Sequence, residues 1–348
     1  SSFWNSYMQL LIRNITLILS LVMMLTHCNL NEYDSSIYKP KAKKDFGSVL
    51  FSLPKKYWHT TLGSELKKQF EKVNKSTPLP YEEQFNIDFI VPENLVNNLK
   101  NKSCIVVIKI DPNQPGFRNP IYINDLWANG QLVIELNFKS EKRAVSYFYN
   151  NCQDVMQRIN SFYFELIQMS YQKNNIINSY LQEELGFNIV APKEMKLNNE
   201  GDNFWWFSQL EMKKDQNGTH EIQKGIVVYK YPYYSESQFS INYHKEKRDS
   251  IGLHFLNGRE SNSYMSTRND DIAPIESLAM QIDDKYVFKT TGAWRMVNDK
   301  MGGTYVNYAF LSHDRTEIIN MEGYVYAPNF KKSKLIREVE AILYSAVQ

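Results

Sequence analysis

The chain has 348 residues, of which 43% are hydrophobic and 14% aromatic, and its formal net charge at pH 7 is +2. This composition is typical of a packed globular protein, and the roughly 300 residues beyond the N-terminal segment suffice for two domains or one large one. The nearly balanced charge, with no segment in which basic residues are massed, argues against nucleic acid as a partner.

The N-terminal segment has the pattern of an export signal. Arg13 precedes a short apolar run over Ile15–Leu25, and polar residues end that run. A membrane-spanning helix needs about 20 apolar residues, so this run is too short to span a bilayer. We therefore expect residues 1–28 to be a signal peptide that directs the chain to the cell envelope.

Cys28 lies where the apolar run ends, in a tetrapeptide that is similar to a bacterial lipobox. Leu25 and Thr26 fit that pattern, whereas His27 stands where a small residue is expected. We favour lipid attachment at Cys28 over ordinary secretion with cleavage elsewhere. Acyl chains on Cys28 would hold the protein on a membrane, since each buried methylene contributes about 0.8 kcal/mol. Residues 29–45 are polar and are expected to form a flexible tether.

From residue 46 the sequence predicts strands interspersed with short helices. Phe85, Ile87 and Phe89 alternate with polar residues, which is typical of a half-buried strand, and the pair Asn129-Gly130 predicts a hairpin. We expect strands over Phe46–Leu53, Phe85–Val91, Cys104–Ile110, Tyr122–Trp127 and Gln131–Phe138, a helix from Ser64 to Val73, and a short helix over Pro92–Leu99.

The longest predicted element is a helix from Ser140 to about Lys173. Its apolar residues recur at steps of three and four, which excludes a strand. Such a helix would be about 45 Å long and could pack on the sheet of its own chain or dimerise; we favour the first. Cys104 and Cys152 each lie at an apolar position of their own element, so we favour free thiols, although an exported protein could pair them.

The second half of the chain is predicted to be mainly strands. A short helix over Ile177–Leu185 ends the first half at Gly186, and the order strand, strand, helix recurs in Phe204–His254 and Thr304–Ala346. We expect strands over Phe187–Leu197, Phe204–Met212, Ile222–Tyr231, Tyr264–Thr267, Tyr286–Val297, Thr304–Leu311 and Glu317–Tyr326, and helices over Ser235–His254 and Phe330–Ala346.

These elements predict an α+β fold, with mainly antiparallel sheets, helices on one face, recurring ββα units and one long helix in the N-terminal half. We expect an N-terminal α+β domain over residues 46–186 and a C-terminal α+β domain over residues 187–348.

The stretch Gly292–Gly303 joins an alternating strand to a double-glycine turn. Trp294 should face one side of the strand and Arg295 the other. A functional interpretation places Arg295, Asp299 and Glu322 around a small polar pocket. The structural interpretation, which we favour, makes Trp294 a core residue, Arg295 and Asp299 a local ion pair, and Gly303 a point of close backbone approach. The candidate ligand-binding residues are Trp294, Arg295, Asn298, Asp299, Gly302, Gly303, Glu322 and Tyr324.

Common catalytic signatures are missing from the sequence. The histidines do not fall at metal-ligand spacing, and there is no nucleophile elbow or phosphate-binding glycine loop. We therefore expect no catalytic residues, metal or cofactor. Two binding hypotheses remain, and in each the structural alternative is favoured. Lys331, Lys332 and Lys334 begin the terminal helix, where an anionic group would be stabilised. The aromatic residues of Tyr229–Tyr234 and Phe204–Phe207 could bind a glycan.

Several long motifs resemble an uncharacterised family. Gly-x-Trp-Arg-Met-x-Asn-Asp-x-Met-Gly-Gly over Gly292–Gly303, and Glu-Gly-Tyr-Val-Tyr-Ala-Pro over Glu322–Pro328, are similar to those of Bacteroidetes envelope lipoproteins known as domain of unknown function 4837. The likeness covers nearly all of Phe46–Tyr344. It implies a lipid-anchored envelope protein and supplies no activity, cofactor or catalytic residue.

Together these patterns favour a non-enzymatic binding or assembly module, anchored by Cys28 to a membrane of the cell envelope, with the outer membrane as the expected one. Its partner would be an envelope protein or a glycan ligand. The alternative is a hydrolase or transferase that acts on cell-wall or glycan material through carboxylates near Asp299 and Glu322.

Overall fold

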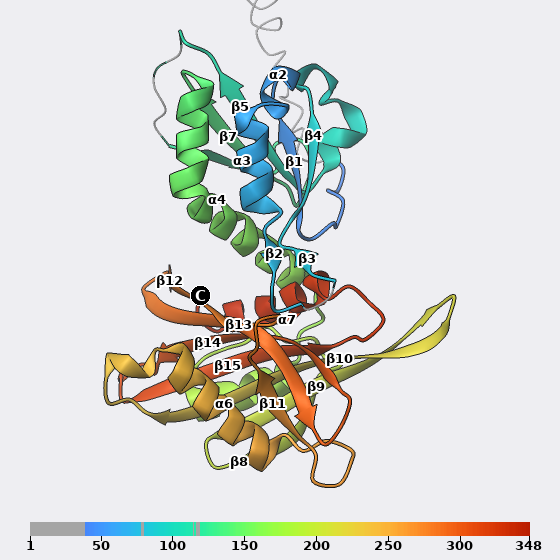
Figure 1. Cartoon of the computed structure of the whole chain (residues 1–348), viewed down its shortest axis with the longest axis vertical. Coiled ribbons are helices and arrows are strands. Elements are labelled where there is room, and N and C mark those ends of the chain that lie inside the picture. Colours follow the sequence, from blue (N-terminus) through green and yellow to red (C-terminus); the bar gives the residue numbers. More distant parts are fainter. Residues whose placement is uncertain (1–38, 78–79, 114, 116–118) are drawn as a thin grey trace, which may run out of the picture.

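The computed structural model describes residues 39–77, 80–113, 115 and 119–348 (Figure 1). The predicted signal peptide, Cys28 and the first part of the tether lie outside these residues. The last part of the tether is ordered: Lys41 and Lys43 form isolated parallel bridges with Asn129 and Lys102. Within the described ranges, no helix is both long enough and apolar enough to cross a membrane.

The N-terminal sheet contains the expected strands. In spatial order they are β4 (Asn86–Ile90), β1 (Ser48–Ser52), β5 (Cys104–Ile110), β7 (Leu132–Phe138) and β6 (Ile121–Asn124). β1 is parallel to β4 and β5, and β5 is parallel to β7, so this sheet departs from the antiparallel pairing that we expected. The reason is that β5 lies at the centre with its first five residues buried, as is usual for a parallel strand. β6 and β7 form the predicted antiparallel hairpin at Asn129-Gly130.

Helices α3 (Thr61–Phe70) and α4 (Glu141–Ser170) pack on one face of this sheet, and a short α2 (Lys55–Trp58) precedes them. α3 begins earlier than predicted: its N-cap is Thr60, and Ser64 lies inside the helix with its hydroxyl bonded to the Thr60 carbonyl. The other face is covered by 3₁₀ turns η2 (Pro92–Asn94) and η3 (Asn97–Asn101), which replace the short helix expected there. A two-stranded arm, β2 (Val73–Asn74) and β3 (Glu82–Glu83), leaves the sheet after α3.

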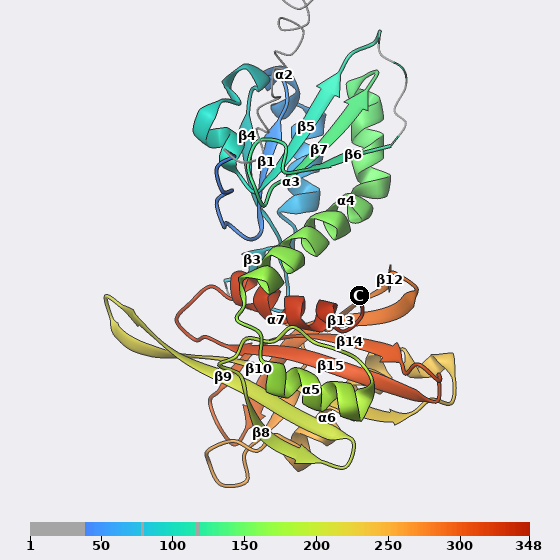
Figure 2. The same ribbon diagram turned by 180° about the vertical axis from the view of Figure 1, so that it is seen from behind.

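The long helix α4 has nearly the boundaries and most of the buried face that the sequence predicts, although Met169 near its end is exposed. The Ser140 hydroxyl caps its start, and Phe148, Val155 and Ile159 are fully buried against the N-terminal sheet. Its last turns run on toward the C-terminal half, where Phe164 and Ile167 join a second core (Figure 2). α4 therefore belongs to both halves of the molecule.

The C-terminal sheet is antiparallel throughout its described pairs, as expected. In spatial order it contains β11 (Tyr264–Arg268), β13 (Lys285–Val297), β14 (Gly302–Leu311), β15 (Glu317–Tyr326), β10 (Gly218–Pro232), β9 (Phe204–Asp215) and β8 (Lys196–Gly201), with β12 (Glu276–Ile282) on β13. Two predictions fail here. Phe187–Leu197 is largely irregular, with the strand starting only at Lys196, and β12 was missed because its residues are mostly exposed and show no clear alternation.

Helices cover both faces of the C-terminal sheet, not one. α5 (Asn175–Leu185) and α7 (Ser333–Ser345) pack on one face, and α6 (Ile241–Phe255) packs on the other (Figures 1 and 2). The two predicted ββα units are present as β9–β10–α6 and β14–β15–α7. Two equivalent units whose second strands pair antiparallel, as β10 and β15 do, would place their helices on the same face of the sheet. Because α6 and α7 lie on opposite faces, the two units are not equivalent. α5 lies in the C-terminal core, although the expected domain boundary at residue 186 follows it. The α+β class is confirmed.

Candidate functional site

The stretch Gly292–Gly303 contains a core tryptophan and a tight glycine, as the structural interpretation expected. Trp294 is 2% exposed and lies opposite Gly303 in the pairing of β13 with β14. A Cβ on Gly303 would collide with the Val325 carbonyl oxygen and would lie 2.9 Å from the Trp294 indole nitrogen. Gly303 is therefore required by close packing. Arg295 lies on the opposite face and is exposed.

The polar residues of this stretch do not gather into a pocket. Asn298 has a left-handed φ of 59°, and the Asp299 carboxylate accepts a hydrogen bond from the Lys300 backbone 2.5 Å away. Within the described part of the chain, Arg295 and Asp299 form no ion pair, so that expectation is wrong. Glu322 pairs with Asn307, five residues along β14 from Gly302, which is about 17 Å along the strand. The carboxylates of Asp299 and Glu322 are thus not neighbours.

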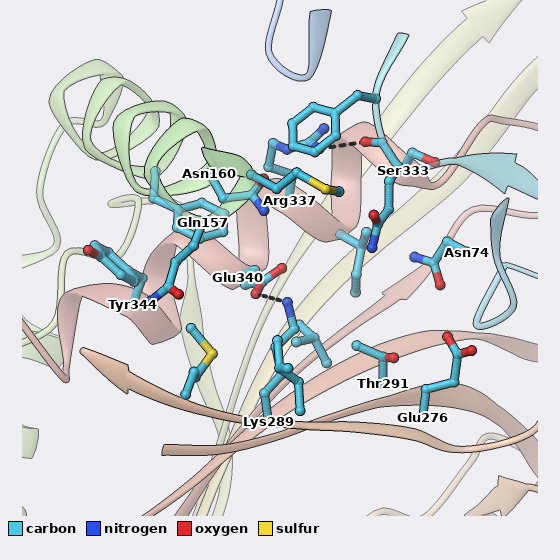
Figure 3. A pocket seen from close by; sticks show the side chains of 18 of the residues that line it. Asn74, Gln157, Asn160, Glu276, Lys289, Thr291, Ser333, Arg337, Glu340 and Tyr344 are labelled. Carbon is cyan, nitrogen blue, oxygen red and sulfur yellow. Dashed lines mark hydrogen bonds and ion pairs between the residues drawn. The ribbon is translucent and has the colours of Figure 1, made fainter. Parts of the chain in front are cut away.

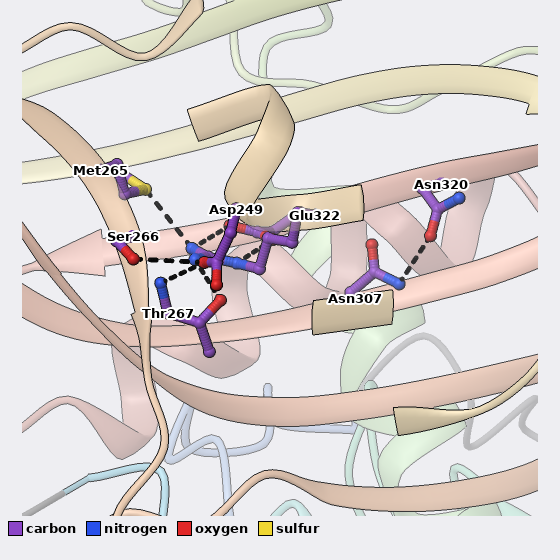
Figure 4. A network of polar contacts seen from close by, with 8 residues as sticks. Asp249, Met265, Ser266, Thr267, Asn307, Asn320 and Glu322 are labelled. Carbon is purple, nitrogen blue, oxygen red and sulfur yellow. Dashed lines mark hydrogen bonds and ion pairs between the residues drawn. The ribbon is translucent and has the colours of Figure 1, made fainter. Parts of the chain in front are cut away.

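Glu322 instead forms a buried ion pair with a residue that the sequence did not single out. Both of its oxygens accept from Arg248 of α6, at 2.7 Å from Nε and 2.8 Å from Nη2 (Figure 4). Arg248 also donates to the Thr267 hydroxyl at 3.1 Å, and its guanidinium lies 4.2 Å from the centre of the Tyr305 ring. Burial opposes the charge on Arg248, but the Glu322 carboxylate raises the pKa of the guanidinium. This pair fastens α6 to the sheet.

A second carboxylate holds the same helix. Asp249 accepts from the Thr267 backbone at 2.7 Å and from the Lys245 ammonium at 2.8 Å. Burial opposes its ionisation, but Lys245 and Thr267 outweigh it, so the pKa of Asp249 is lowered. Two adjacent residues of α6 are therefore bonded to β11 and β15.

Around this pair lies a layer of buried polar atoms between α6 and the sheet. His244 is 3% exposed, and neither of its ring nitrogens has a hydrogen-bond partner among the described residues. Burial, with Arg248 nearby, lowers the pKa of His244 to about 3, so the ring is neutral at physiological pH. The hydroxyls of Tyr229 and Tyr305 in this layer also lack partners within the described residues. This layer positions α6 and has no free carboxylate.

The best-formed pocket lies between the two halves of the molecule. Its volume is about 470 Å³, which is in the range of small-molecule sites, and domain interfaces are a common place for such sites (Figure 3). The walls are the middle of α4, the arm β2–β3, the start and middle of α7, the edge strand β12, and its neighbours β13 and β14. The side chains that define it include Gln153, Asn160, Glu276, Lys289, Thr291, Ser333, Arg337 and Glu340.

One charged pair in this pocket is satisfied within the protein. The Lys289 ammonium donates to the Glu340 carboxylate, which also accepts from the Tyr308 hydroxyl at 2.8 Å. By contrast, the side-chain amides of Gln153 and Asn160 have no partner within the described residues. The pocket therefore presents free amide groups, the Glu340 carboxylate, which is already occupied, and the Glu276 carboxylate, which has no partner within the described residues.

Arg337 also lines the pocket, and among the described residues it forms no ion pair. It is half-buried, its guanidinium lies 5.2 Å from the centre of the Phe85 ring, and Nη2 donates to the Gln84 carbonyl at 2.8 Å. Gly47 lies against the guanidinium so closely that a Cβ there would collide with it. Burial lowers the pKa of Arg337, and the influence of Tyr163 and of the nearby Glu340 carboxylate only partly offsets it.

The two halves are fastened on one side of the pocket by the arm. Glu82 accepts from the backbone N–H groups of Lys332 and Ser333 at the start of α7, at 2.7 Å for the nearest oxygen in each case. The N–H groups at this helix start, where the sequence suggested an anionic ligand, are occupied by a carboxylate of the chain itself. Lys331 and Lys334 are exposed, as the favoured interpretation held.

The other candidates are structural. Phe204, Trp205, Phe207 and Tyr229 are buried in the cores, so the aromatic cluster is chiefly packing. Cys104 and Cys152 are free and buried, and burial raises the pKa of both thiols, that of Cys152 to about 12. Within the described ranges there is no cluster of three metal-ligating side chains.

Comparison with known families divides the chain in two. Residues 173–345 match the model described as Domain of unknown function (DUF4837), and residues 46–172 match the one described as Domain of unknown function (DUF8532). The two matches meet between α4 and α5. No curated protein matches the sequence.

Proposed function

We propose that this chain, whose residues 173–345 match the DUF4837 family, is an anchored binding protein of the cell envelope. It holds a small polar ligand between its two halves and does not transform it. The observation that carries this proposal is the pocket of about 470 Å³, which both halves line and in which amide groups are free to bond a ligand. Its Glu340 carboxylate is neutralised by Lys289 and so is poorly suited to acid–base chemistry.

The binding site is tested by filling it. Asn160→Trp would place a large ring in the pocket from the exposed side of α4, and Asn151→Trp changes an exposed residue of the same helix outside the pocket. The full chain would be purified from its own envelope and examined by native mass spectrometry. We expect a co-purified small molecule on the wild type and on Asn151→Trp, and its loss from Asn160→Trp. An equal amount on all three proteins would refute the assignment of this pocket.

The anchor is tested independently. The signal-like segment and the lipobox-like position of Cys28 support export and lipid attachment, with the outer membrane as the proposed location. Cys28→Ser should move the protein from the membrane to the soluble envelope fraction while leaving ligand binding intact. Unchanged membrane partition of that variant would rule out the anchor and leave the binding proposal standing.

A further inference from the structure

The charges of the interdomain pocket are not all balanced from within. Lys289 and Glu340 pair with each other, and Lys72 and Glu83 are exposed at the rim. Two half-buried charged groups, Arg337 of α7 and Glu276 of β12, form no ion pair within the described residues. A cation that is partly removed from water is usually paired, since desolvating an unpaired charge is costly. The pocket thus contains a cationic group that makes no direct contact with a carboxylate among the described residues, although Glu340 acts on it from a distance.

The guanidinium of Arg337 is also held in place. The Phe85 ring packs on it at 5.2 Å, Gly47 lies against it, and the Gln84 carbonyl accepts one of its five N–H groups. The other N–H groups have no acceptor among the described residues. A fixed planar fork of donors is suited to the oxygens of a carboxylate or a phosphate, because little side-chain entropy remains to be lost on binding.

The neighbouring turn of α7 already binds such a group. The backbone N–H groups of Lys332 and Ser333 hold the Glu82 carboxylate, and Arg337 follows Ser333 by one helical turn on the same side. The positive end of the helix therefore contributes to the potential around Arg337. The groups farther along the pocket include the amides of Gln153 and Asn160 and the Glu276 carboxylate, which suit a ligand whose remaining part is polar and carries hydrogen-bond donors.

We propose that the ligand of this pocket carries an anionic group, a carboxylate or a phosphate, and that the guanidinium of Arg337 binds it. This inference rests on the proposed function and specifies the chemistry of its ligand. Charged hydrogen bonds contribute roughly 1.5–3 kcal/mol, so removing the anion or the guanidinium should weaken binding about tenfold or more.

The test uses two matched pairs of probes and the full-length Cys28→Ser protein. Binding of N-acetylglycylglycine is compared with that of its C-terminal amide, and glucose 6-phosphate with glucose, by titration calorimetry. We expect one anionic probe to bind about tenfold or more tightly than its neutral partner and to weaken as ionic strength rises. The pair that shows the difference identifies the anion as a carboxylate or a phosphate.

Variants connect that preference to Arg337. Arg337→Gln should abolish it, whereas Arg143→Gln, an exposed arginine in the first turn of α4, should preserve it. If Arg337→Gln fails to fold, Asn160→Trp decides, because filling the pocket must remove the preference as well. Equal binding within both pairs, no binding of any probe, or a preference that survives in folded Arg337→Gln would overturn the inference. If the neutral probes bind as tightly as the anionic ones and Asn160→Trp excludes them, the inference about the anion is overturned, but the pocket remains a binding site.

Discussion

At the scale of single residues, glycines on the α6 side of the C-terminal sheet make room for aromatic rings. Gly303 lies opposite Trp294, and Gly225 lies opposite Tyr324, whose ring occupies the space that a Cβ would need. These cross-strand pairs explain why the glycine-containing motifs are specific without forming a reactive site: they are packing solutions. The candidate residues around them serve the fold.

Alanine substitutions on neighbouring positions of β13 should separate core from surface. Trp294→Ala removes a side chain that is 2% exposed and should lower the free energy of unfolding by about 3–5 kcal/mol. Arg295→Ala removes an exposed side chain from the other face and should change it by less than about 0.5 kcal/mol. Urea unfolding of the two variants measures both values, and similar losses would contradict the assignment of the two faces.

The buried imidazole of His244 predicts a pH dependence of stability. Because burial lowers its pKa to about 3 from the usual 6.5, the unfolded chain gains a proton between these values that the folded chain does not. The free energy of unfolding should therefore fall as pH falls through this window, by roughly 1 kcal/mol per pH unit from this group. Arg248 and Asp249 of α6, Tyr305 of β14 and Glu322 of β15 lie near the same ring. The two carboxyl groups also contribute to the pH dependence, but they are present in every protein compared below, so the difference between the wild type and a His244 variant reports on His244.

The measurement is urea unfolding at several pH values for the wild type and His244→Leu. The free energy of unfolding of His244→Leu should fall less steeply between pH 6.5 and 3, because leucine does not bind a proton in the unfolded chain. His254→Leu, which changes an exposed histidine of the same helix, should keep the wild-type slope. An identical slope in all three proteins would show that His244 is not buried as a neutral ring.

At the scale of elements, the sequence was informative where periodicity and burial agree. The helix over α4 could be predicted within a few residues, because steps of three and four mark its buried face and Ser140 caps its start. β12 and β8 could not, because strands with mostly exposed side chains are fixed by their hydrogen-bonded neighbours and not by a pattern of their own. The parallel pairing of β1 with β5 was missed for a similar reason: apolar runs do not encode which neighbour they pair with.

The register of α4 is tested by a charge in its buried face. Ile159→Asp introduces a carboxylate at a position that is fully buried and should destabilise the protein by several kcal/mol. Asn151→Asp, at an exposed position of the same helix, serves as the control and should leave the thermal midpoint nearly unchanged. A small shift for both variants would mean that residue 159 faces solvent.

At the scale of the whole molecule, α4 and the arm join two sheets that the sequence predicted separately. Glu82 reaches the start of α7 across 250 positions of sequence, and Tyr81 donates to the Ile272 carbonyl at 2.6 Å. Contacts this distant leave no local pattern, so the pocket between the halves, with Arg337 in it, could not be predicted. The sequence did indicate that the start of α7 could attract an anion, because several lysines lie there beside the positive end of the helix dipole.

Removing that fastening should loosen α7 without unfolding the cores. Glu82→Ala takes the carboxylate away from the Lys332 and Ser333 amides, which should cost about 0.5–2 kcal/mol, as loss of a helix cap does. Hydrogen exchange should then be faster in the first turn of α7 and in the arm, and unchanged in β5. Glu83→Ala, next to it and exposed, is the control. Unaltered exchange at α7 in Glu82→Ala would show that the arm does not fasten the two halves.

Whether the space between the halves is a ligand-binding site can be seen directly in an experimental structure of the protein purified from its own envelope. We expect a bound non-protein molecule between α4, α7 and β13, with an anionic group in contact with Arg337 and a polar group near Asn160. A pocket filled only by water, or by the protein's own side chains after the halves have closed on each other, would contradict it.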